Sequence, residues 1–320
     1  MQKGLVVRNT GSRYIVKLDE NGEMVPCALK GNFRIKGVRT TNPVAVGDHV
    51  EISGTPTSPE ESAFIVKVEP RRNYIIRRAS NLSKESHILA SNVDQALLVV
   101  TLFHPTTSTT FVDRFLATCE AYNVKALIAI NKTDLLADDE EKEYLKGFEF
   151  LYRQIGYEVF PLSARTGDGV EPLQEHLKDK ITLLSGNSGV GKSTLINCLI
   201  PGLDLKTAEI SNIHDTGMHT TTFSEMFQLP QGGWLIDTPG VKGFGTIEFE
   251  ARETDHYFPE IFEISSRCRY DDCSHVMEPG CAVREALENQ HIALSRYNSY
   301  LSVLEEARSN GSSDKYRKPF

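Results

Sequence analysis

The first part of the chain contains short stretches in which apolar and polar residues alternate, a pattern typical of half-buried β-strands. Five such stretches lie within residues 1–70, separated by polar turns such as Asn9-Thr10-Gly11-Ser12. They cover residues 4–8, 13–17, 24–29, 48–52 and 63–68. Five short strands joined by polar turns predict a small closed β-barrel, and an OB-fold is the fold that we expect for residues 1–70.

The hydrophobic pattern changes at about residue 93, where continuous apolar runs of strand length begin to alternate with stretches of helix length. The apolar runs are residues 95–101, 124–130, 158–162, 181–185, 223–229 and 234–237. The helical stretches are residues 109–122, 138–155, 169–177 and 194–200. This alternation predicts a parallel sheet with helices on both faces.

The remaining segments are more polar. Residues 71–92 contain the pairs Arg71-Arg72 and Arg77-Arg78, and we expect a polar linker there. The predicted domains are therefore a barrel (1–70), a linker (71–92), an α/β domain (93–245) and a C-terminal domain (246–320). In the C-terminal domain we expect helices at 282–290 and 292–308 and a disordered basic tail at 315–318.

One glycine-rich segment joins the apolar run 181–185 to a predicted helix. It reads Gly186-Asn187-Ser188-Gly189-Val190-Gly191-Lys192-Ser193, followed by Thr194. Strand, G-x-x-x-x-G-K-S and helix form the context of a phosphate-binding P-loop, whose backbone N–H groups surround the phosphates of a nucleotide. Lys192 would reach the β- and γ-phosphates, and the Ser193 hydroxyl would bind Mg²⁺.

Three further motifs each follow a predicted strand, at the sheet edge where α/β proteins bind ligands. Asn131-Lys132-Thr133-Asp134 has the form N-K-x-D, in which the Asp134 carboxylate can accept the N1–H and 2-amino groups of guanine. Ser163-Ala164 could place a backbone N–H on the guanine O6. Asp237-Thr238-Pro239-Gly240 has the form D-x-x-G, with Asp237 in the outer coordination sphere of Mg²⁺ and the Gly240 N–H facing the γ-phosphate.

The order of these motifs is unusual. Common GTPases present the P-loop, a switch threonine, D-x-x-G, N-K-x-D and S-A in that order, whereas N-K-x-D and S-A come first here. The order predicts a circularly permuted GTPase domain, which is possible because the ends of a compact domain usually lie close together. An ATP-dependent kinase is disfavoured, since adenine lacks the pair of donors that N-K-x-D recognises.

Four potential metal ligands lie within 14 residues of the C-terminal domain: Cys268, Cys273, His275 and Cys281. Three thiolates and one imidazole suit a tetrahedral Zn²⁺, and a complete set of four indicates one structural ion. Incidental clustering of thiols is the alternative. Pro279-Gly280 supplies the turn that would bring Cys281 back to the other three.

Composition and charge refine this interpretation. The chain of 320 residues has a net charge of −8, which argues weakly against a nucleic-acid partner, yet residues 1–40 carry eight basic against three acidic residues. This basic region is either an oligonucleotide-binding rim or a solvated surface. No apolar run approaches the roughly 18 residues of a membrane span, and the N-terminus lacks a signal-peptide core. We therefore expect a cytoplasmic protein that does not enter a membrane. The cysteine spacing does not resemble a disulfide framework.

With these motifs in this order, the chain resembles the ribosome small-subunit-dependent GTPase A family (RsgA/YjeQ) over its whole length. The resemblance implies an OB-fold bound to rRNA, a GTPase stimulated by the small subunit, and a role in late maturation of that subunit. The implied partners are the 30S subunit, 16S rRNA and GTP or GDP, and the protein is expected to be a monomer. An RNA-binding module in which nucleotide acts only as a conformational latch is the alternative.

The segment before the run 223–229 resembles the switch I motif of that family, usually G-R-H-T-T-T. It reads Gly217-Met218-His219-Thr220-Thr221-Thr222, so that Met218 replaces the arginine. Thr221 is the expected Mg²⁺ ligand, with Thr222 as the alternative. Val241 follows Gly240, where Ras-like enzymes place a water-orienting glutamine. Another group must therefore position the water, and the family assigns this role to His219; the alternative is an exposed loop histidine without a catalytic role.

Overall fold

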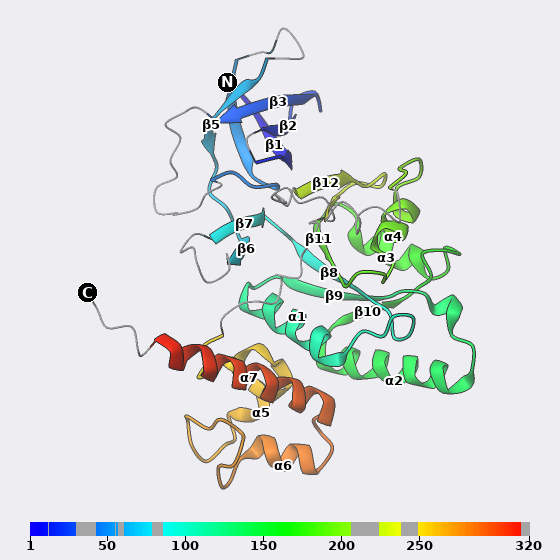
Figure 1. Cartoon of the computed structure of the whole chain (residues 1–320), viewed down its shortest axis with the longest axis vertical. Coiled ribbons are helices and arrows are strands. Elements are labelled where there is room, and N and C mark those ends of the chain that lie inside the picture. Colours follow the sequence, from blue (N-terminus) through cyan, green and yellow to red (C-terminus); the bar gives the residue numbers. More distant parts are fainter. Residues whose placement is uncertain are drawn as a thin grey trace.

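The computed structural model describes residues 1–11, 13–29, 43–54, 56, 61–78, 86–205, 224–237 and 249–314. A small barrel lies at one end of the long axis, a sheet flanked by helices lies in the middle, and the C-terminal helices lie at the other end (Figure 1). The three regions therefore follow one another in space in the same order as along the chain.

The N-terminal region is a closed five-stranded barrel. Its strands are β1 (Gln2–Asn9), β2 (Tyr14–Leu18), β3 (Met24–Leu29), β4 (His49–Ser53) and β5 (Ala63–Val68). They pair in the order β1-β2-β3-β5-β4, and β4 pairs with β1 to close the barrel. Alternate residues point inward, and Val6, Tyr14, Val16, Ile52 and Ile65 fill the interior. The predicted OB-type barrel is confirmed.

The stretch expected to be a polar linker contains an antiparallel hairpin, formed by β6 (Tyr74–Arg78) and β7 (Ser86–Ser91). Ile75 and Ala90 are fully buried and belong to the largest hydrophobic core of the molecule. The prediction missed the hairpin because its few apolar residues stand between arginines and other polar residues. Part of residues 71–92 is therefore a hairpin that packs against the hydrophobic core of the molecule and not a polar linker.

The central sheet has the strand order β10-β9-β8-β11-β13-β12. Its strands are β8 (Gln95–Val100), β9 (Lys125–Ile130), β10 (Glu158–Pro161), β11 (Ile181–Ser185), β12 (Ser224–Gln228) and β13 (Trp234–Asp237). The first five in this order are parallel, and β12 is antiparallel to β13. The order places the P-loop strand β11 in the centre, beside β8 and β13.

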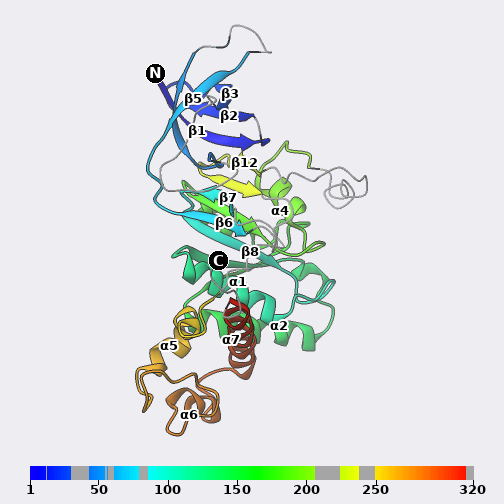
Figure 2. The ribbon, with the colours of Figure 1, turned by 60° about the vertical axis from the view of Figure 1, so that its left-hand side comes forward.

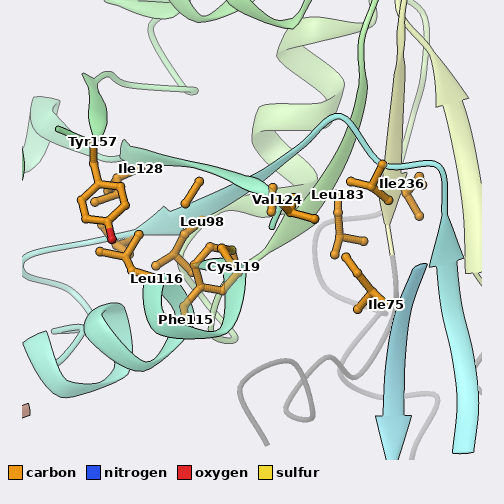
Figure 3. Close-up of a cluster of buried hydrophobic side chains, with 14 of the residues drawn as sticks. Ile75, Leu98, Phe115, Leu116, Cys119, Val124, Ile128, Tyr157, Leu183 and Ile236 are labelled. Carbon is orange, nitrogen blue, oxygen red and sulfur yellow. The ribbon is translucent and has the colours of Figure 1, made fainter. Parts of the chain in front are cut away.

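Helices cover both faces of this sheet, as predicted. They are α1 (Thr109–Ala121) and α2 (Asp139–Ile155) on one face and α3 (Val170–Leu177) and α4 (Lys192–Leu199) on the other. Strand β8 supplies both cores, because successive side chains of a strand point to opposite faces. Leu98 packs with Phe115 and Leu116 of α1 (Figure 3), whereas Leu97 belongs to the core under α3 and α4.

The barrel and the central sheet are joined by main-chain pairing. Strand β1 pairs with β4 through residues 2–5, and beyond them Arg8 and Asn9 pair antiparallel with β12 while they stay paired with β2. This pairing makes one 11-stranded sheet. The register of β1 against β2 shifts between Val6 and Arg8, so that Val7 is an extra residue, as in a β-bulge. Val6 then points into the barrel, while Leu5 and Val7 join the core of the central domain. The sequence did not indicate this continuity.

The C-terminal region contains η3 (Thr254–Tyr257), α5 (Pro259–Ser265), α6 (Ala282–Glu288) and α7 (Leu294–Asp314). The last two confirm the predicted helices with shifted bounds, and the tail 315–318 lies outside the described residues. Helix α7 packs along α1 (Figures 1 and 2), and the core of this region includes Ala117 of α1. Among the described residues, no helix is long and apolar enough to cross a bilayer.

A buried ionic network fixes α7 to the central domain. The guanidinium of Arg296 donates from Nη1 to Asp113 of α1 (2.8 Å) and from Nε and Nη2 to Glu260 of α5 (2.6 and 3.0 Å). The Tyr152 hydroxyl of α2 also donates to Asp113. Arg296 is 1% exposed and Asp113 is fully buried, so each charge depends on its partners for solvation.

Candidate functional site

The P-loop has the backbone geometry that its glycines allow. Gly186 and Gly191 have φ angles of 147° and 93°. A Cβ on Gly186 would lie 2.3 Å from the Val99 carbonyl oxygen, and one on Gly191 would lie 2.4 Å from Nδ2 of Asn131. Both contacts exclude a side chain. The two glycines thus allow the loop to lie against β8 and the N-K-x-D motif.

Lys192 begins α4 and turns back into the loop. Its Nζ donates to the carbonyl oxygens of Gly186 (2.7 Å) and Asn187 (2.8 Å). Burial lowers the pKa of Lys192, and the nearby carboxylate of Asp237 opposes this shift. The predicted phosphate-binding residues Asn187, Ser188 and Gly189 are exposed, whereas Ser193 and Thr194 are half-buried in the first turn of α4. The ammonium is therefore held at the loop backbone.

Asn131 connects three of the predicted motifs. Its side chain is 4% exposed, donates from Nδ2 to the Val190 carbonyl of the P-loop (2.8 Å) and accepts at Oδ1 from the Ala164 N–H (2.9 Å). The sequence predicts that Ser163-Ala164 could place a backbone N–H on guanine O6; in the structure the Ala164 N–H donates to Asn131 and the Ser163 N–H donates to the Asp168 carbonyl oxygen. The structure brings N-K-x-D, S-A and the P-loop together at one edge of the sheet, as their positions after strands predict.

Asp134, the expected guanine reader, is held from two sides. It accepts from the Ser163 hydroxyl at Oδ1 (2.6 Å) and pairs with Arg165 at Oδ2. The hydrogen bond from Ser163 and the interactions with Arg165 lower the pKa of Asp134, although partial burial opposes them. Its carboxylate therefore stays ionised, which acceptance of two guanine donors requires.

The loop that follows β8 also contacts this site, and the sequence motifs did not identify it. Lys132 donates from Nζ to the His104 carbonyl oxygen (2.7 Å). The Pro105 ring lies beside Gly189, since a Cβ atom on Gly189 would lie 3.6 Å from Cγ of Pro105. The Thr101 hydroxyl closes the loop on the Pro105 carbonyl (2.5 Å). No nucleotide-binding pattern marks residues 101–107, so their sequence carried no signal.

Asp237 ends β13 beside the P-loop. Burial raises the pKa of Asp237, the Lys192 ammonium opposes the shift, and the carboxylate of Glu225 adds to it. The predicted residues His219, Thr221, Thr222 and Gly240 lie outside the described residues. The described part of the site thus contains the predicted guanine side, the P-loop and the first residue of D-x-x-G.

The four predicted zinc ligands converge in the C-terminal region. Their ligand atoms all lie within 4.8 Å of one another. Nδ1 of His275 lies 3.6 Å from Sγ of Cys268 and 3.5 Å from Sγ of Cys281. Bond lengths of about 2.0 and 2.3 Å at a tetrahedral zinc give nitrogen–sulfur separations of about 3.5 Å. The donor set and its spacing therefore fit Zn²⁺, with Nδ1 of His275 as the ligand atom.

The loop that carries these ligands is supported by hydrogen bonds. Glu278 accepts from the Ser274 N–H and hydroxyl and from the N–H groups of Val276 and Met277, at 2.6–3.0 Å. Despite partial burial, these bonds lower the pKa of Glu278 to about 2. Nε2 of His275 faces Oδ2 of Asp255 at 3.6 Å, and carboxylates commonly orient ligand histidines. Asp255 precedes the cluster by 13 residues, so ligand spacing could not reveal it.

Replacing Cys273 with Ser is expected to remove zinc from the protein, because three remaining ligands leave a four-coordinate ion incomplete. Elemental analysis should give about one zinc per chain before the change and much less after it. Limited proteolysis should then cleave residues 250–300 faster, since a small region with a thin core depends on its metal. Cys198→Ser is the matched control, as Cys198 lies on α4 away from the cluster. Full zinc retention in Cys273→Ser would reject the ligand assignment.

Comparison with known families agrees with this arrangement. Residues 68–247 match the RsgA GTPase family, and residues 3–60 match the RsgA N-terminal domain. The chain belongs to the RsgA GTPase family. The first match includes N-K-x-D, the P-loop and D-x-x-G in the order in which they occur here. The permuted motif order is therefore a property of the matched domain.

Relatives in this family share most of the chain. The small ribosomal subunit biogenesis GTPase RsgA of Bacteroides fragilis (strain YCH46) is 60% identical over 304 residues, which cover 95% of this chain and 96% of the relative. The protein of the same name from Porphyromonas gingivalis (strain ATCC 33277) is 55% identical over 307 residues, with 95% and 96% coverage. These RsgA proteins match along almost their whole length.

Two solved structures have the same fold. YjeQ from Thermotoga maritima superimposes with a TM-score of 0.75 at 36% identity, over 96% of this chain and 98% of YjeQ. YloQ, described as a circularly permuted GTPase, gives a TM-score of 0.73 at 28% identity, over 100% of this chain and 97% of YloQ. The circular permutation predicted from the motif order is therefore confirmed.

Proposed function

We propose that this GTPase binds the small (30S) ribosomal subunit and its 16S rRNA, acts in late maturation of that subunit, and hydrolyses GTP faster when bound to it. The observation that carries the proposal is the junction at Asn131, which ties a guanine-reading motif to a P-loop. Relatives that are 55–60% identical over 95% of the chain are named for biogenesis of the small ribosomal subunit. The basic residues of the barrel suit contact with rRNA.

In this proposal separate groups of residues bind the base, the phosphates and the magnesium ion. Asp134 reads the guanine, with Ser163 and Ala164 at its edge, and Asn131, Lys132 and Thr133 shape the turn. The N–H groups of residues 186–191 and 194 and the ammonium of Lys192 bind the phosphates. Ser193 and Thr221 would hold Mg²⁺, with Asp237 in its outer sphere and the Gly240 N–H at the γ-phosphate, and the ion would neutralise developing phosphate charge. The placement of Asp237 beside Lys192 fits such a charged site.

The water-positioning group is expected to be His219. Val241 carries no hydrogen-bonding group, so it cannot orient the attacking water. If the small subunit holds His219 in the attacking geometry more often than the free protein does, the rate rises by roughly the inverse of the free populated fraction. A 10- to 100-fold stimulation then needs only about 1.4–2.7 kcal/mol of ordering.

Replacing His219 with Ala is expected to remove most of the stimulation by 30S subunits and to leave GTP affinity nearly unchanged. The measurement is single-turnover GTP hydrolysis with saturating 30S subunits, 50S subunits or neither. The wild-type chain should respond strongly to 30S and not to 50S subunits.

Two outcomes would contradict the proposal in different ways. A His219→Ala variant that 30S subunits still stimulate fully would remove this histidine from the mechanism. Equal response to both subunits, or binding to 30S subunits without stimulation, would favour the nucleotide-latch alternative. His291→Ala is the matched control, because His291 is exposed on the C-terminal region, away from the nucleotide site.

The cofactors and setting follow from the same proposal. One structural Zn²⁺ would be held by Cys268, Cys273, His275 and Cys281, where the ligand spacing fits it. We propose a monomer that works in the cytoplasm, where ribosomal subunits mature.

A further inference from the structure

A row of charged side chains crosses from the barrel to the nucleotide site. Arg8 of β1 is the register partner of Glu225 of β12, and Glu225 is the register partner of Asp237 of β13. Directly opposite residues of neighbouring strands project from the same face of a sheet, with Cβ atoms about 5 Å apart. The barrel therefore contributes one member of a three-strand row that ends at the P-loop.

The row carries one positive charge, on Arg8, followed by two negative charges, on Glu225 and Asp237. Arg8 forms an ion pair with Glu225. Glu225 lies opposite a second carboxylate, that of Asp237. The charge of Glu225 raises the pKa of Asp237, whereas the charge of Lys192 lowers it. Like charges directly opposite one another on a sheet are unfavourable. Without Arg8, two neighbouring carboxylates would lie together at the end of the row, where the Lys192 ammonium opposes their charge.

We propose that Arg8, a barrel residue, is a positioning residue of the GTPase site, where it neutralises Glu225 and so preserves the affinity of the Asp237 end for a nucleoside triphosphate. Arg8 acts through Glu225 and need not touch the nucleotide. The inference rests on the proposed function, because it takes the D-x-x-G segment that begins at Asp237 as the γ-phosphate side.

A second cation of the same interface provides a comparison within the molecule. Lys17 of β2 donates from Nζ to Oε1 of Gln228 at the other end of β12 (2.7 Å) and lies 5.0 Å from the Trp234 ring centre. Gln228 lies three residues beyond Glu225, about 10 Å further from the row along the strand. Lys17 thus contacts β12 from the barrel, as Arg8 does, but its partner Gln228 is neutral and remote from Asp237.

The test measures the affinities of GDP and of a non-hydrolysable GTP analogue, both with Mg²⁺, by fluorescence titration. An unpaired carboxylate about 10 Å from an added phosphate charge changes affinity by roughly 2- to 15-fold, depending on the effective dielectric constant. Arg8→Ala should weaken binding of the analogue by this factor and change GDP binding less than 2-fold. Arg8→Lys should retain most of the wild-type preference, and Lys17→Ala should not alter the ratio of the two affinities.

Glu225→Gln separates this electrostatic role from a docking role. In the Arg8→Ala background it should restore the wild-type affinity ratio, because the charge that Arg8 neutralises is gone. Alone, it should maintain or raise affinity for the analogue. If Arg8→Ala weakens both nucleotides equally, or if Glu225→Gln does not restore the ratio, Arg8 only docks the barrel and the inference is wrong. Failure of the wild-type chain to bind the analogue would instead reject the proposed function.

Discussion

Replacing Asp134 with Asn should weaken GTP binding by about 100-fold or more and shift the preference of the protein toward xanthosine triphosphate. The Asp134 carboxylate can accept the N1–H and 2-amino groups of guanine, and hydrogen bonds to a charged group contribute about 1.5–3 kcal/mol each. An amide offers one acceptor and presents donors that suit the C2 carbonyl of xanthine. Equilibrium titration with both triphosphates measures the change.

Two variants control for indirect effects of this substitution. Asp138→Asn is the matched exchange, since Asp138 caps α2 by accepting from the Glu141 N–H (2.8 Å) and Asn caps helices equally well. Ser163→Ala removes the hydroxyl that holds Asp134 without removing the carboxylate. Wild-type GTP affinity in Asp134→Asn would show that Asp134 does not read the base.

Replacing Arg296 with Ala should lower the stability of the protein by about 3–5 kcal/mol, because the change leaves Asp113 and Glu260 without their common cation. Breaking a buried ion pair from one side costs more than the pair contributes, since the remaining charge stays desolvated. Urea unfolding followed by circular dichroism should show an earlier loss of helix, which includes α7 and the helices that it contacts.

Arg308→Ala provides the comparison for this prediction, since Arg308 lies on the same helix but is exposed. It should change stability by less than about 0.5 kcal/mol. A similarly small effect of Arg296→Ala would mean that water reaches the carboxylates and that the network does not fix α7 to α1.

Sequence patterns predicted those parts of the fold that depend on neighbouring residues. The alternation in β2 and the continuous apolar run of β8 reflect burial on one and on two faces, so each strand could be recognised by itself. The motif order predicted the permutation, because N-K-x-D precedes the P-loop here, whereas it follows the P-loop in common GTPases. Helix α5 was missed because Ile261 is its one buried residue and no apolar face repeats along it, whereas α6, of the same length, buries Val283 and Ala286 three residues apart.

Contacts between distant segments could not be predicted in this way. Arg8 and Glu225 are separated by more than 200 residues, and nothing local shows that β1 has a second partner strand. From the sequence alone Arg296 is expected at the surface, because nothing local shows that Asp113 and Glu260 surround it in the folded protein. In the candidate site, the motifs predicted Asp134, Asn131 and Lys192, whereas the His104 carbonyl acts through the backbone and leaves no side-chain signature.

The pairing of β1 with β12 also concerns the solubility of the protein. Strand β12 is flanked by β13 on one side and by β1 on the other, so the barrel covers the start of what would otherwise be an open sheet edge, at Ser224 and Glu225. Open edges recruit strands from other chains and promote aggregation. A fragment that lacks the barrel would expose this edge together with the apolar surface that Leu5 and Val7 cover. The barrel therefore serves the rest of the chain as a cap against self-association, whatever else it binds.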